Sequence, residues 1–267
     1  MKPAQKAPAL FVSHGAPTFA LEPGLLGPKL KDLGERLSGL QAVLVASAHW
    51  QTAGVQVMTT AAPETIHDFG GFPAALYRLQ YPAPGAPGLA AEAGAVLKAA
   101  GFGVSFDDHR GIDHGAWVPL LYLLPQAQIP VFQVSLPLDF DAPQALKLGI
   151  ALAPLRERGV LVLGSGSLTH NLREIGASDP EVTRYALEFT EWVRRHVRDR
   201  DVESLADYRR RAPHAQRAHP TEEHFLPLLI ALGASEQADR VEVIEGGMTY
   251  GVLSMESYAF GSPTTSE

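Results

Sequence analysis

Three histidines that each follow a short apolar run are the residues best suited to chemistry in this sequence. They are His14, His49 and His170, and each stands at or just beyond the end of a segment with the composition of a buried strand. Neutral imidazole is the commonest metal-binding side chain near pH 7. Three such rings brought to one place would therefore form a metal site. For any one of them alone, a hydrogen-bonded histidine at a strand end is the plainer interpretation.

Two further histidines, His219 and His224, lie five residues apart in a segment that also contains Thr221 and two glutamates. The metallopeptidase motif H-E-x-x-H needs a spacing of four, so that both rings share one helical face. At about 100° per residue, a spacing of five turns the second ring about 140° away. In a helix, only one of the two could then bind the ion, and the other would contact substrate or support a ligand. The alternative is a helix start with Thr221 as its cap.

Histidines next to carboxylates form a second group. His114 follows Asp113, and His67 precedes Asp68. A carboxylate can orient a nearby imidazole, although adjacent residues usually point apart, so we expect His114 at the site and give His67 a weaker claim. Three histidines in polar surroundings are predicted to lie on the surface: His109, His196 and His214.

Composition limits the classes of function. The chain has no cysteine, which excludes disulfide frameworks and zinc–thiolate sites and leaves His, Asp and Glu as the strong metal ligands. The formal net charge is −7, and no Lys/Arg block is interleaved with aromatic residues. A nucleic-acid partner is therefore not expected. The hydrophobic fraction of 46% over 267 residues suits one large core.

The elements that must position these side chains alternate between apolar runs and helical patterns, which is typical of an α/β domain. Nearly continuous apolar runs predict interior strands at Ala9–Ser13, Ala42–Ala46, Val131–Leu136 and Val160–Gly164. Weaker edge or antiparallel strands are predicted at Gln56–Thr60 and Val241–Ile244. Helices are predicted at Leu89–Ala100, Ala142–Arg158, Glu181–Arg198 and Asp201–Arg211. No repeat or linker divides the chain, so we expect one catalytic domain over residues 1–267, with 262–267 as a loose tail.

The predicted strands also explain how distant histidines could meet. In open α/β sheets, ligands bind in the crevice beyond the carboxyl ends of the strands. His14, His49 and His170 each follow a different predicted strand, with a Gly-Ser-Gly-Ser turn before His170. The sequence therefore predicts that these rings face one edge of the sheet. The long Pro- and Gly-rich loop Phe69–Gly88 is expected to cover one face, since ordered loops of that length are usually functional.

Membrane segments and nucleotide motifs are not indicated. The stretch from Gly115 to Leu138 carries no formal charge, but its prolines and glutamines favour a buried helix followed by a strand. The first apolar run is too short for a signal peptide, so a cytoplasmic protein without a membrane partner is expected. Gly164-Ser-Gly166 begins like a dinucleotide fingerprint but lacks the third glycine, and there is no G-x-S-x-G or Walker motif.

Six blocks, spread in order from about residue 9 to residue 260, together resemble the class III extradiol ring-cleavage dioxygenases, in particular the DOPA 4,5-dioxygenase-like branch. The blocks are Ser13-His14-Gly15, Ser47-Ala48-His49-Trp50, Ile66-His67-Asp68-Phe69-Gly70-Gly71-Phe72-Pro73, Asp113-His114-Gly115-Ala116-Trp117, Gly164-Ser165-Gly166-Ser167-Leu168-Thr169-His170-Asn171-Leu172 and His219-Pro220-Thr221-Glu222-Glu223-His224-Phe225-Leu226-Pro227. The resemblance implies a single α/β domain whose mixed central sheet has helices on both faces. It also implies one non-haem iron at the strand-end edge.

The resemblance further implies roles for individual residues. By it, the metal ligands are His14, His49 and His224, with His170 as the acid/base residue and a possible fourth ligand. His114 is expected to be a second catalytic residue in contact with substrate. The resemblance also makes His219 a supporting or substrate-contacting residue. Apart from the resemblance, substrate contacts are predicted for His67, from its neighbouring carboxylate, and for Trp117, as an aromatic residue of the pocket. Better-known members of the wider class use two histidines and one carboxylate, and His224 in the third position is a departure from them.

Three functions fit these residues. The first is an Fe(II)-dependent dioxygenase that opens the ring of a small catechol-type diol with O₂. The second is a hydrolase with Zn(II) on the same three histidines, since Zn(II) also suits imidazole ligands and can replace iron during purification. The third is a non-catalytic scaffold that the metal stabilises. The sequence favours no particular catechol and no oligomeric state.

Overall fold

The computed structural model describes residues 6–177 and 179–261, and one eight-stranded sheet organises them. The strand order is β4-β3-β5-β2-β6-β1-β10-β7. The strands are β1 (Ala9–Ser13), β2 (Ala42–Thr52), β3 (Val55–Met58), β4 (Val104–Asp107), β5 (Val131–Pro137), β6 (Val160–Gly166), β7 (Val241–Ile244) and β10 (Ser257–Phe260). A separate hairpin pairs β8 (Met248–Thr249) with β9 (Leu253–Ser254). All four strands predicted for the sheet interior are present.

The sheet is mixed, as the resemblance implies. Strands β5, β2, β6 and β1 run parallel at its centre, whereas β10 is antiparallel to β1, β7 is antiparallel to β10, and β3 is antiparallel to β5. The central strands are fully or almost fully buried apolar segments, as expected for parallel strands covered on both faces. Because the four central strands are parallel, their carboxyl ends share one edge.

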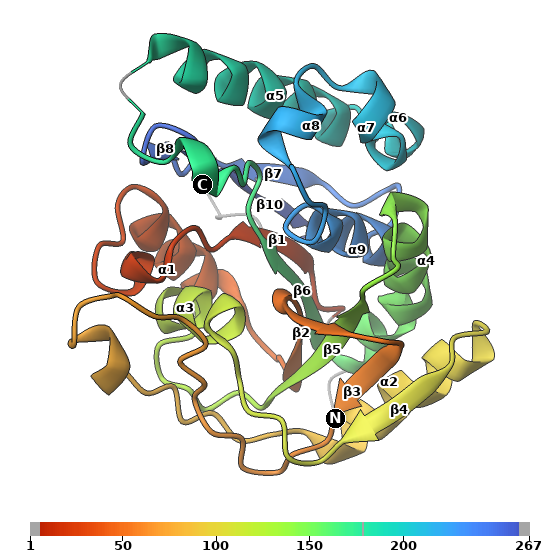
Figure 1. Ribbon diagram of the computed structural model, residues 1–267. Helices are drawn as coiled ribbons and strands as arrows, with labels where there is room; N and C mark the ends of the chain where they lie inside the picture. Colours follow the sequence, from red (N-terminus) through yellow and green to blue (C-terminus); the bar gives the residue numbers. More distant parts are fainter. Residues whose placement is uncertain (1–5, 178, 262–267) are drawn as a thin grey trace.

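Helices cover both faces of this sheet (Figure 1). One face carries α2 (Pro87–Ala99), α4 (Ala142–Leu152) and α9 (Leu226–Ala234), and the other carries α1 (Leu26–Arg36) and α3 (His114–Leu123). A further group lies beyond the β10–β7 side: α5 (Pro180–Arg198), α6 (Val202–Ala206), α7 (Tyr208–Arg211) and α8 (Ala215–Ala218). Short 3₁₀ turns complete the chain at η1 (Pro17–Ala20), η2 (Leu76–Arg78), η3 (Ala153–Arg158) and η4 (Leu172–Glu174).

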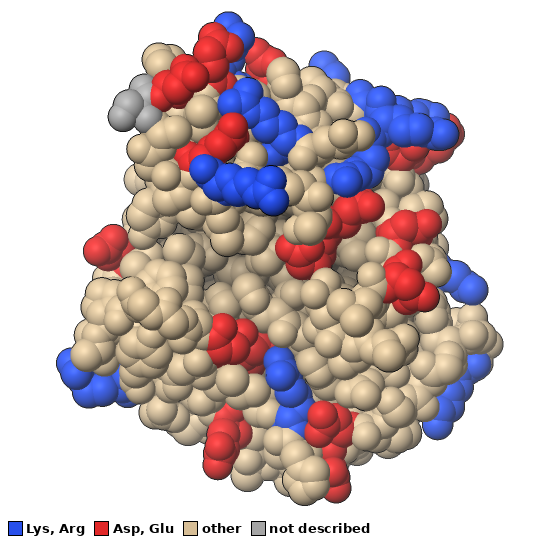
Figure 2. Space-filling view, viewed as in Figure 1, with Lys and Arg blue, Asp and Glu red and all other residues tan. Residues whose placement is uncertain are grey.

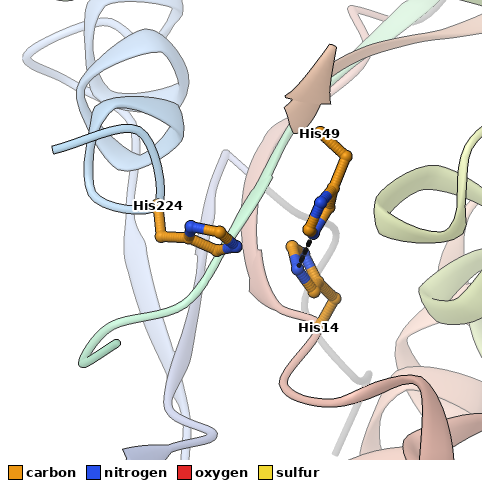
Figure 3. Close-up of side chains that lie close together, drawn as sticks. All are labelled: His14, His49 and His224. Carbon is orange, nitrogen blue, oxygen red and sulfur yellow. Dashed lines mark hydrogen bonds between the residues drawn. The ribbon is translucent and has the colours of Figure 1, made fainter. Parts of the chain in front are cut away.

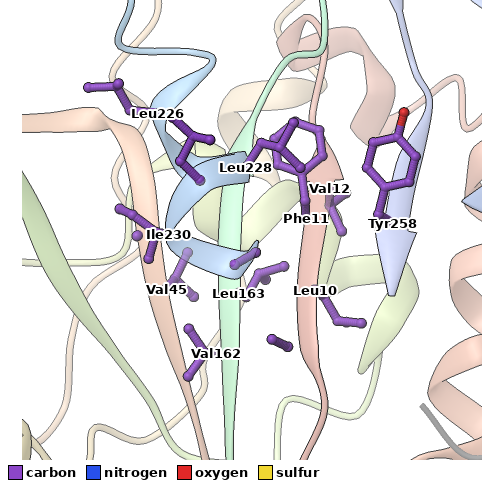
Figure 4. Packing of buried hydrophobic residues seen from close by; sticks show 14 of the residues in the cluster. Leu10, Phe11, Val12, Val45, Val162, Leu163, Leu226, Leu228, Ile230 and Tyr258 are labelled. Carbon is purple, nitrogen blue, oxygen red and sulfur yellow. The ribbon is translucent and has the colours of Figure 1, made fainter. Parts of the chain in front are cut away.

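Helix α9 is the centre of the core. All nine of its residues are buried, as expected for a helix that is apolar on every side. It packs on β1 and β6, and Leu228 lies against Phe11 of β1 (Figure 4). The two glycines of β6 allow this close approach. A Cβ added at Gly164 would overlap the carbonyl oxygen of Pro227, and one at Gly166 would overlap that of His224. The Gly-Ser-Gly segment therefore serves strand-to-helix packing rather than a dinucleotide.

A Gly164→Ala substitution should consequently destabilise the protein. The added methyl group meets the backbone of α9, which cannot move without disturbing the core, so we expect a loss of about 1–3 kcal/mol in the free energy of unfolding. Urea unfolding of the variant measures this loss. Gly103→Ala is the matched control, because a Cβ at Gly103 meets no atom within 4 Å. Equal stability of the two variants would contradict the close approach of α9 to β6.

Several boundaries differ from the sequence-based expectation. The predicted helix Ala142–Arg158 is α-helical only to Leu152 and continues as the 3₁₀ turn η3, with Pro154 near its start. The predicted helix Asp201–Arg211 is divided into α6 and α7 at Asp207. Strand β2 continues to Thr52 and β6 to Gly166, so the predicted turn before His170 begins as strand.

The uncharged stretch from Gly115 to Leu138 forms the greater part of α3 and then β5, as predicted. None of the described helices combines the length and the apolar character that crossing a bilayer requires. The predicted loose tail, residues 262–267, lies outside the described residues.

Candidate metal centre

Three histidines from distant parts of the chain converge at the strand-end edge (Figure 3). His14 follows β1 directly, His49 lies inside the carboxyl-terminal half of β2, and His224 stands two residues before α9. One ring nitrogen of each lies within 4.8 Å of the others. The Nε2 atoms of His14 and His49 are 2.9 Å apart. The structure thus brings together the three rings that the resemblance assigns to the metal.

The partners of His14 fix which of its nitrogens carries the proton. The Ser165 hydroxyl donates its only hydrogen to the carbonyl of Gly115. Its oxygen can therefore only accept from Nδ1 of His14, which lies 3.0 Å away. Because a neutral imidazole has one N–H, Nε2 of His14 carries a lone pair. This lone pair faces His49.

The carboxylate of Glu223 fixes the position of the ring proton of His224 in the same way. Its Nδ1 lies 2.8 Å from Oε1 of Glu223, which accepts the hydrogen and leaves a lone pair on Nε2. This Nε2 is buried and has no hydrogen-bond partner among the described residues. A buried polar atom without a partner is rare in proteins and calls for an explanation. A metal ion would supply it.

The geometry and charge of the cluster both fit one divalent ion. Nitrogens that each lie ~2.1 Å from a common ion at right angles are about 3.0 Å apart, close to the separation of 2.9 Å between His14 and His49. Burial, followed by the neighbouring histidines, lowers the pKa of both His14 and His224 well below the ordinary value. Burial and then His114 lower the pKa of His49 to about 4. All three rings are therefore neutral at pH 7 and ready to bind a cation.

A Ser165→Ala variant should weaken metal binding without removing a ligand. The substitution leaves Nδ1 of His14 without its acceptor, so the ring is free to rotate or change tautomer. Loss of such an orienting partner lowers metal affinity by roughly 10–100-fold. Titration of the metal-free variant with Fe(II) or Zn(II) against a competing chelator measures the change. Unaltered affinity would show that the hydroxyl does not orient His14.

His170 lies against the centre. Its ring stacks on that of His224, with centroids 3.4 Å apart and an interplanar angle of 11°. Burial lowers the pKa of His170 to about 4, although the negative charge of Glu223 acts to raise it. The ring is therefore neutral at pH 7 and can accept a proton beside the metal position.

His114 also lies at the centre, and a residue distant in the sequence orients it. Its ring lies 3.9 Å from that of His49, centroid to centroid. Both its Nδ1 and its backbone N–H are 2.9 Å from Oδ1 of Asp68. Burial acts to raise the pKa of Asp68, but the hydrogen bonds from His114 outweigh it and lower the pKa to about 2.

The adjacent carboxylate, Asp113, points away from His114. It is fully buried and accepts hydrogen bonds from Ser47, Arg110 and Gln133. Because Ser47 also binds the backbone N–H of His49, this network supports β2 at the metal centre. Asp68, not Asp113, is the carboxylate that orients His114.

His67 and Trp117 lie beside the long loop and not among the metal-binding nitrogens. His67 is bonded through Nε2 to the carbonyl of Leu79 at 3.0 Å. Trp117 is fully buried and donates its indole N–H to Ile66. The two rings lie 5.6 Å apart in an edge contact. This pair anchors the start of the loop, and its predicted contact with substrate stays a prediction.

His219 is fully buried behind the centre. Its Nε2 lies 2.9 Å from the carbonyl of Leu168, and it belongs to none of the candidate metal groups among the described residues. The segment from His219 to His224 is not helical, because α9 begins only at Leu226. The helix start with Thr221 as cap is therefore wrong. Instead, the Thr221 hydroxyl bonds to Glu223.

The predicted surface histidines differ in exposure. His109 and His214 are exposed, as predicted. The prediction is wrong in part for His196, which is half-buried. Its ring packs on Trp192, and its Nδ1 bonds to the carbonyl of the same residue.

The burial of His219 predicts a pH dependence of stability. Burial lowers the pKa of His219 to about 3, against an ordinary value of 6.5. Above pH 6.5 both the folded and the unfolded states are neutral at this residue. Below it the unfolded state binds a proton that the folded state cannot, so stability falls as the pH falls toward about 3. From about pH 7.5 to about pH 5.5 this amounts to roughly 1 kcal/mol.

Urea unfolding of the metal-free protein and of a His219→Gln variant at both pH values tests this effect. The loss of stability on acidification should be smaller in the variant by that amount. Equal losses would show that His219 is accessible to protons in the folded state.

Two residues of the centre were missed in the sequence, namely Ser165 and Glu223. Ser165 is paired in the sheet with Val12 of β1 and Ser47 of β2, each of which stands two residues before a histidine of the centre. Only this register identifies it. Glu223 stands next to His224 in the sequence, but only the non-helical turn lets its carboxylate reach the neighbouring ring.

The face that carries the centre is hollowed near the ends of the central strands, with acidic and basic side chains at the rim (Figure 2). Beside His224, a cavity of about 420 Å³ has Glu223, Arg209 and Gln51 in its wall. This cavity borders Glu223, which bonds to Nδ1 of His224, and none of the described histidines is in its wall.

Comparisons with known proteins give a consistent result. The family model described as the catalytic LigB subunit of aromatic ring-opening dioxygenase matches residues 26–261. A protein of Beta vulgaris named 4,5-DOPA dioxygenase extradiol is 40% identical over 256 residues, which cover 94% of this chain and 96% of that protein. A protein of the same name from Escherichia coli K12 is 38% identical, with 96% and 95% covered.

A solved structure is also similar. The crystal structure of an uncharacterized protein from Escherichia coli K12 matches with a TM-score of 0.77 and 32% identity. The match covers 96% of this chain and all of the other. The mixed sheet and its helices are therefore shared across the full length of that protein.

Proposed function

This chain belongs to the LigB family of aromatic ring-opening dioxygenases, the class III extradiol enzymes, and from that premise we propose that it opens a catechol-type ring with O₂ at an Fe(II) ion held by His14, His49 and His224. The observation that carries the proposal is the convergence of three neutral imidazoles. One ring nitrogen of each lies within 4.8 Å of the others, and Nε2 of His224 is buried without a partner among the described residues.

Fe(II) is proposed because the reaction needs an ion that can exchange electrons with O₂. Zn(II) binds the same ligands but has no redox chemistry. It nevertheless outcompetes Fe(II) for nitrogen ligands, so a purified sample is expected to contain some zinc. Three facial histidine ligands leave open positions for a catechol and for O₂, and a bound ion would supply Lewis acidity that favours the ionised diol.

The remaining histidines handle the proton and the substrate. His170 is neutral at pH 7, so it can accept a proton from a catechol hydroxyl and later return it, a role worth roughly 10²–10⁴ in rate. His114 bonds through Nδ1 to Asp68, which leaves Nε2 as the ring nitrogen available for a hydrogen bond with substrate. The three proposed ligand rings are neutral and add no positive charge of their own, so the charge of the ion would draw a catecholate to the site.

The substrate class is a small aromatic diol. Curated relatives from Beta vulgaris, Portulaca grandiflora and Escherichia coli K12 are all named 4,5-DOPA dioxygenase extradiol. DOPA is therefore the first compound to test, followed by catechols with neutral or acidic side chains. We propose that residues 1–267 act as one catalytic domain and that the protein is cytoplasmic, which cell fractionation would test. No observation favours the zinc hydrolase or the non-catalytic scaffold.

Anaerobic reconstitution of the metal-free protein with Fe(II), followed by addition of oxygenated buffer and a catechol, tests the function. We expect oxygen uptake with formation of a yellow ring-opened product, and no uptake with Zn(II) in place of Fe(II). Absence of uptake with every catechol in the panel would contradict the proposal. Hydrolysis of an ester by the zinc form would favour the hydrolase instead.

A further inference from the structure

His219 lies in a fully buried aromatic cage behind the metal centre. Its ring centroid is 5.6 Å from that of Phe189, 6.2 Å from that of Tyr208 and 5.2 Å from that of Phe225. The ring uses one nitrogen, because Nε2 donates to the carbonyl of Leu168. Its other nitrogen, Nδ1, is buried without a hydrogen-bond partner among the described residues.

This unpaired nitrogen indicates that an imidazole is needed here for more than filling space. A phenyl ring would fill the same cage without burying an acceptor that lacks a partner, which is unfavourable. The feature that distinguishes the imidazole is its N–H. Among the described residues, that N–H reaches only the carbonyl of Leu168.

The hydrogen bond to Leu168 belongs to a set of three between two segments. The backbone N–H of Ser167 donates to the carbonyl of His224 at 3.0 Å, and that of His170 donates to the carbonyl of Ala218 at 2.8 Å. The bond from His219 lies between these two. Of these three hydrogen bonds, the bond from His219 is the one made by a side chain. A substitution can therefore remove it.

These bonds tie the loop that carries His170 to the segment that carries His224, whereas the Leu168 N–H and the Thr169 hydroxyl tie the same loop to Ser13 and Val252. His170 stands beyond the end of β6, in a loop and not in the sheet, so the sheet alone does not fix its position. Its ring nevertheless stacks on His224 at 3.4 Å. Misplacement of a reacting group by about 1 Å can reduce a rate by about 10²-fold. The loop therefore needs an anchor on the segment that carries His224.

We propose that His219 is a positioning residue, which holds the loop 167–170 through its hydrogen bond to Leu168 and thereby sets His170 against the metal ligand His224. This inference rests on the proposed function, since it takes His170 as the proton-handling residue. His219 itself is assigned no contact with the metal or with substrate.

Two substitutions separate the hydrogen bond from the shape of the ring. His219→Phe keeps an aromatic ring in the cage and removes the donor, whereas His219→Gln keeps an N–H near the position of Nε2. In His219→Phe we expect kcat to fall by about 10–100-fold with KM and bound metal unchanged. In His219→Gln we expect much of kcat to be recovered. If His219→Phe does not fold, His219→Met serves as the apolar variant without a donor.

Hydrogen exchange provides a readout that does not depend on turnover. Backbone amides of residues 167–170, measured by mass spectrometry on the metal-free protein, should exchange faster in His219→Phe than in the unmodified protein and in His219→Gln. Phe189→Leu is the matched control, because it alters the same cage without touching the loop's hydrogen bonds. It should lower the melting temperature while leaving kcat close to its original value.

A double-mutant cycle with His170→Ala decides whether His219 acts through His170. If it does, His219→Phe causes no further loss of turnover in the His170→Ala background. An additive loss would overturn the proposal, as would equal impairment of His219→Gln and His219→Phe or unchanged exchange in the loop. Failure of the proposed function is distinct from these outcomes, because the unmodified Fe(II) protein would then take up no oxygen.

Discussion

A His224→Ala variant is expected to lose its bound metal and, with it, all measurable ring opening. Two histidines would remain, and the cavity left by the ring admits water that competes for the ion. Loss of a supporting partner alone weakens metal affinity by about 10–100-fold, so loss of a ligand should exceed ~100-fold. Elemental analysis after dialysis against a weak chelator measures bound iron, and an oxygen electrode measures turnover.

The control for this variant is His109→Ala, which removes an imidazole whose side chain is 94% exposed. That variant should retain the metal and the activity of the unmodified protein. If His224→Ala kept a full complement of iron under the same dialysis, His224 would not be a ligand. The third ligand would then have to come from the two neighbouring candidate groups, which contain His114 and Asp68 in one and His170 and Glu223 in the other.

A His170→Ala variant is expected to behave differently, with iron retained and turnover reduced by about 10²–10⁴-fold. The physical reason is that His170 stacks on a ligand and remains neutral at pH 7, so its absence removes a proton acceptor and not a ligand. Bound iron and single-turnover oxygen uptake should be measured on the same sample.

Exposed His214 provides the matched alanine control for His170. Unchanged turnover in His170→Ala would exclude the assigned proton-handling role. Loss of iron would instead identify His170 as a fourth ligand, an alternative that the resemblance leaves open.

Much of the sheet was predictable because parallel strands covered on both faces leave continuous apolar runs. The runs beginning at Ala9, Ala42, Val131 and Val160 became β1, β2, β5 and β6. Helix α9 was not predicted, since a helix that is apolar on all sides lacks the periodicity by which surface helices are recognised. The α-helix ends at Leu152 because Pro154 lacks the N–H that the helical hydrogen-bond ladder needs. This effect is confined to one turn, so the overall helical pattern of the segment did not reveal it.

The convergence of His14 and His49 was predictable for a related reason. His14 follows β1 and His49 lies in the carboxyl-terminal half of β2, and the carboxyl ends of parallel strands share an edge. The groups that orient the rings were not predictable in this way. Asp68 reaches His114 from a loop 46 residues away in the sequence, and Ser165 is identified only by its register in the sheet. No local pattern encodes either contact.

The pair His219 and His224 shows how one assumption about local structure can mislead. A helical segment would have turned the two rings apart by rotation alone. The structure separates them in another way, because a non-helical turn places His224 beside His14 and His49 and places His219 in an aromatic cage, bonded to the Leu168 carbonyl. This placement, and not rotation about a helix, supports the proposal that His224 is a ligand and His219 a supporting residue.

The most direct test is a crystal structure of the Fe(II)-reconstituted protein with anomalous data collected on both sides of the iron absorption edge. We expect one strong anomalous peak per chain, ~2.1 Å from the Nε2 atoms of His14, His49 and His224. A peak on other side chains, or ordered rings of these three histidines with no peak between them, would contradict the metal centre and the chemistry proposed for it.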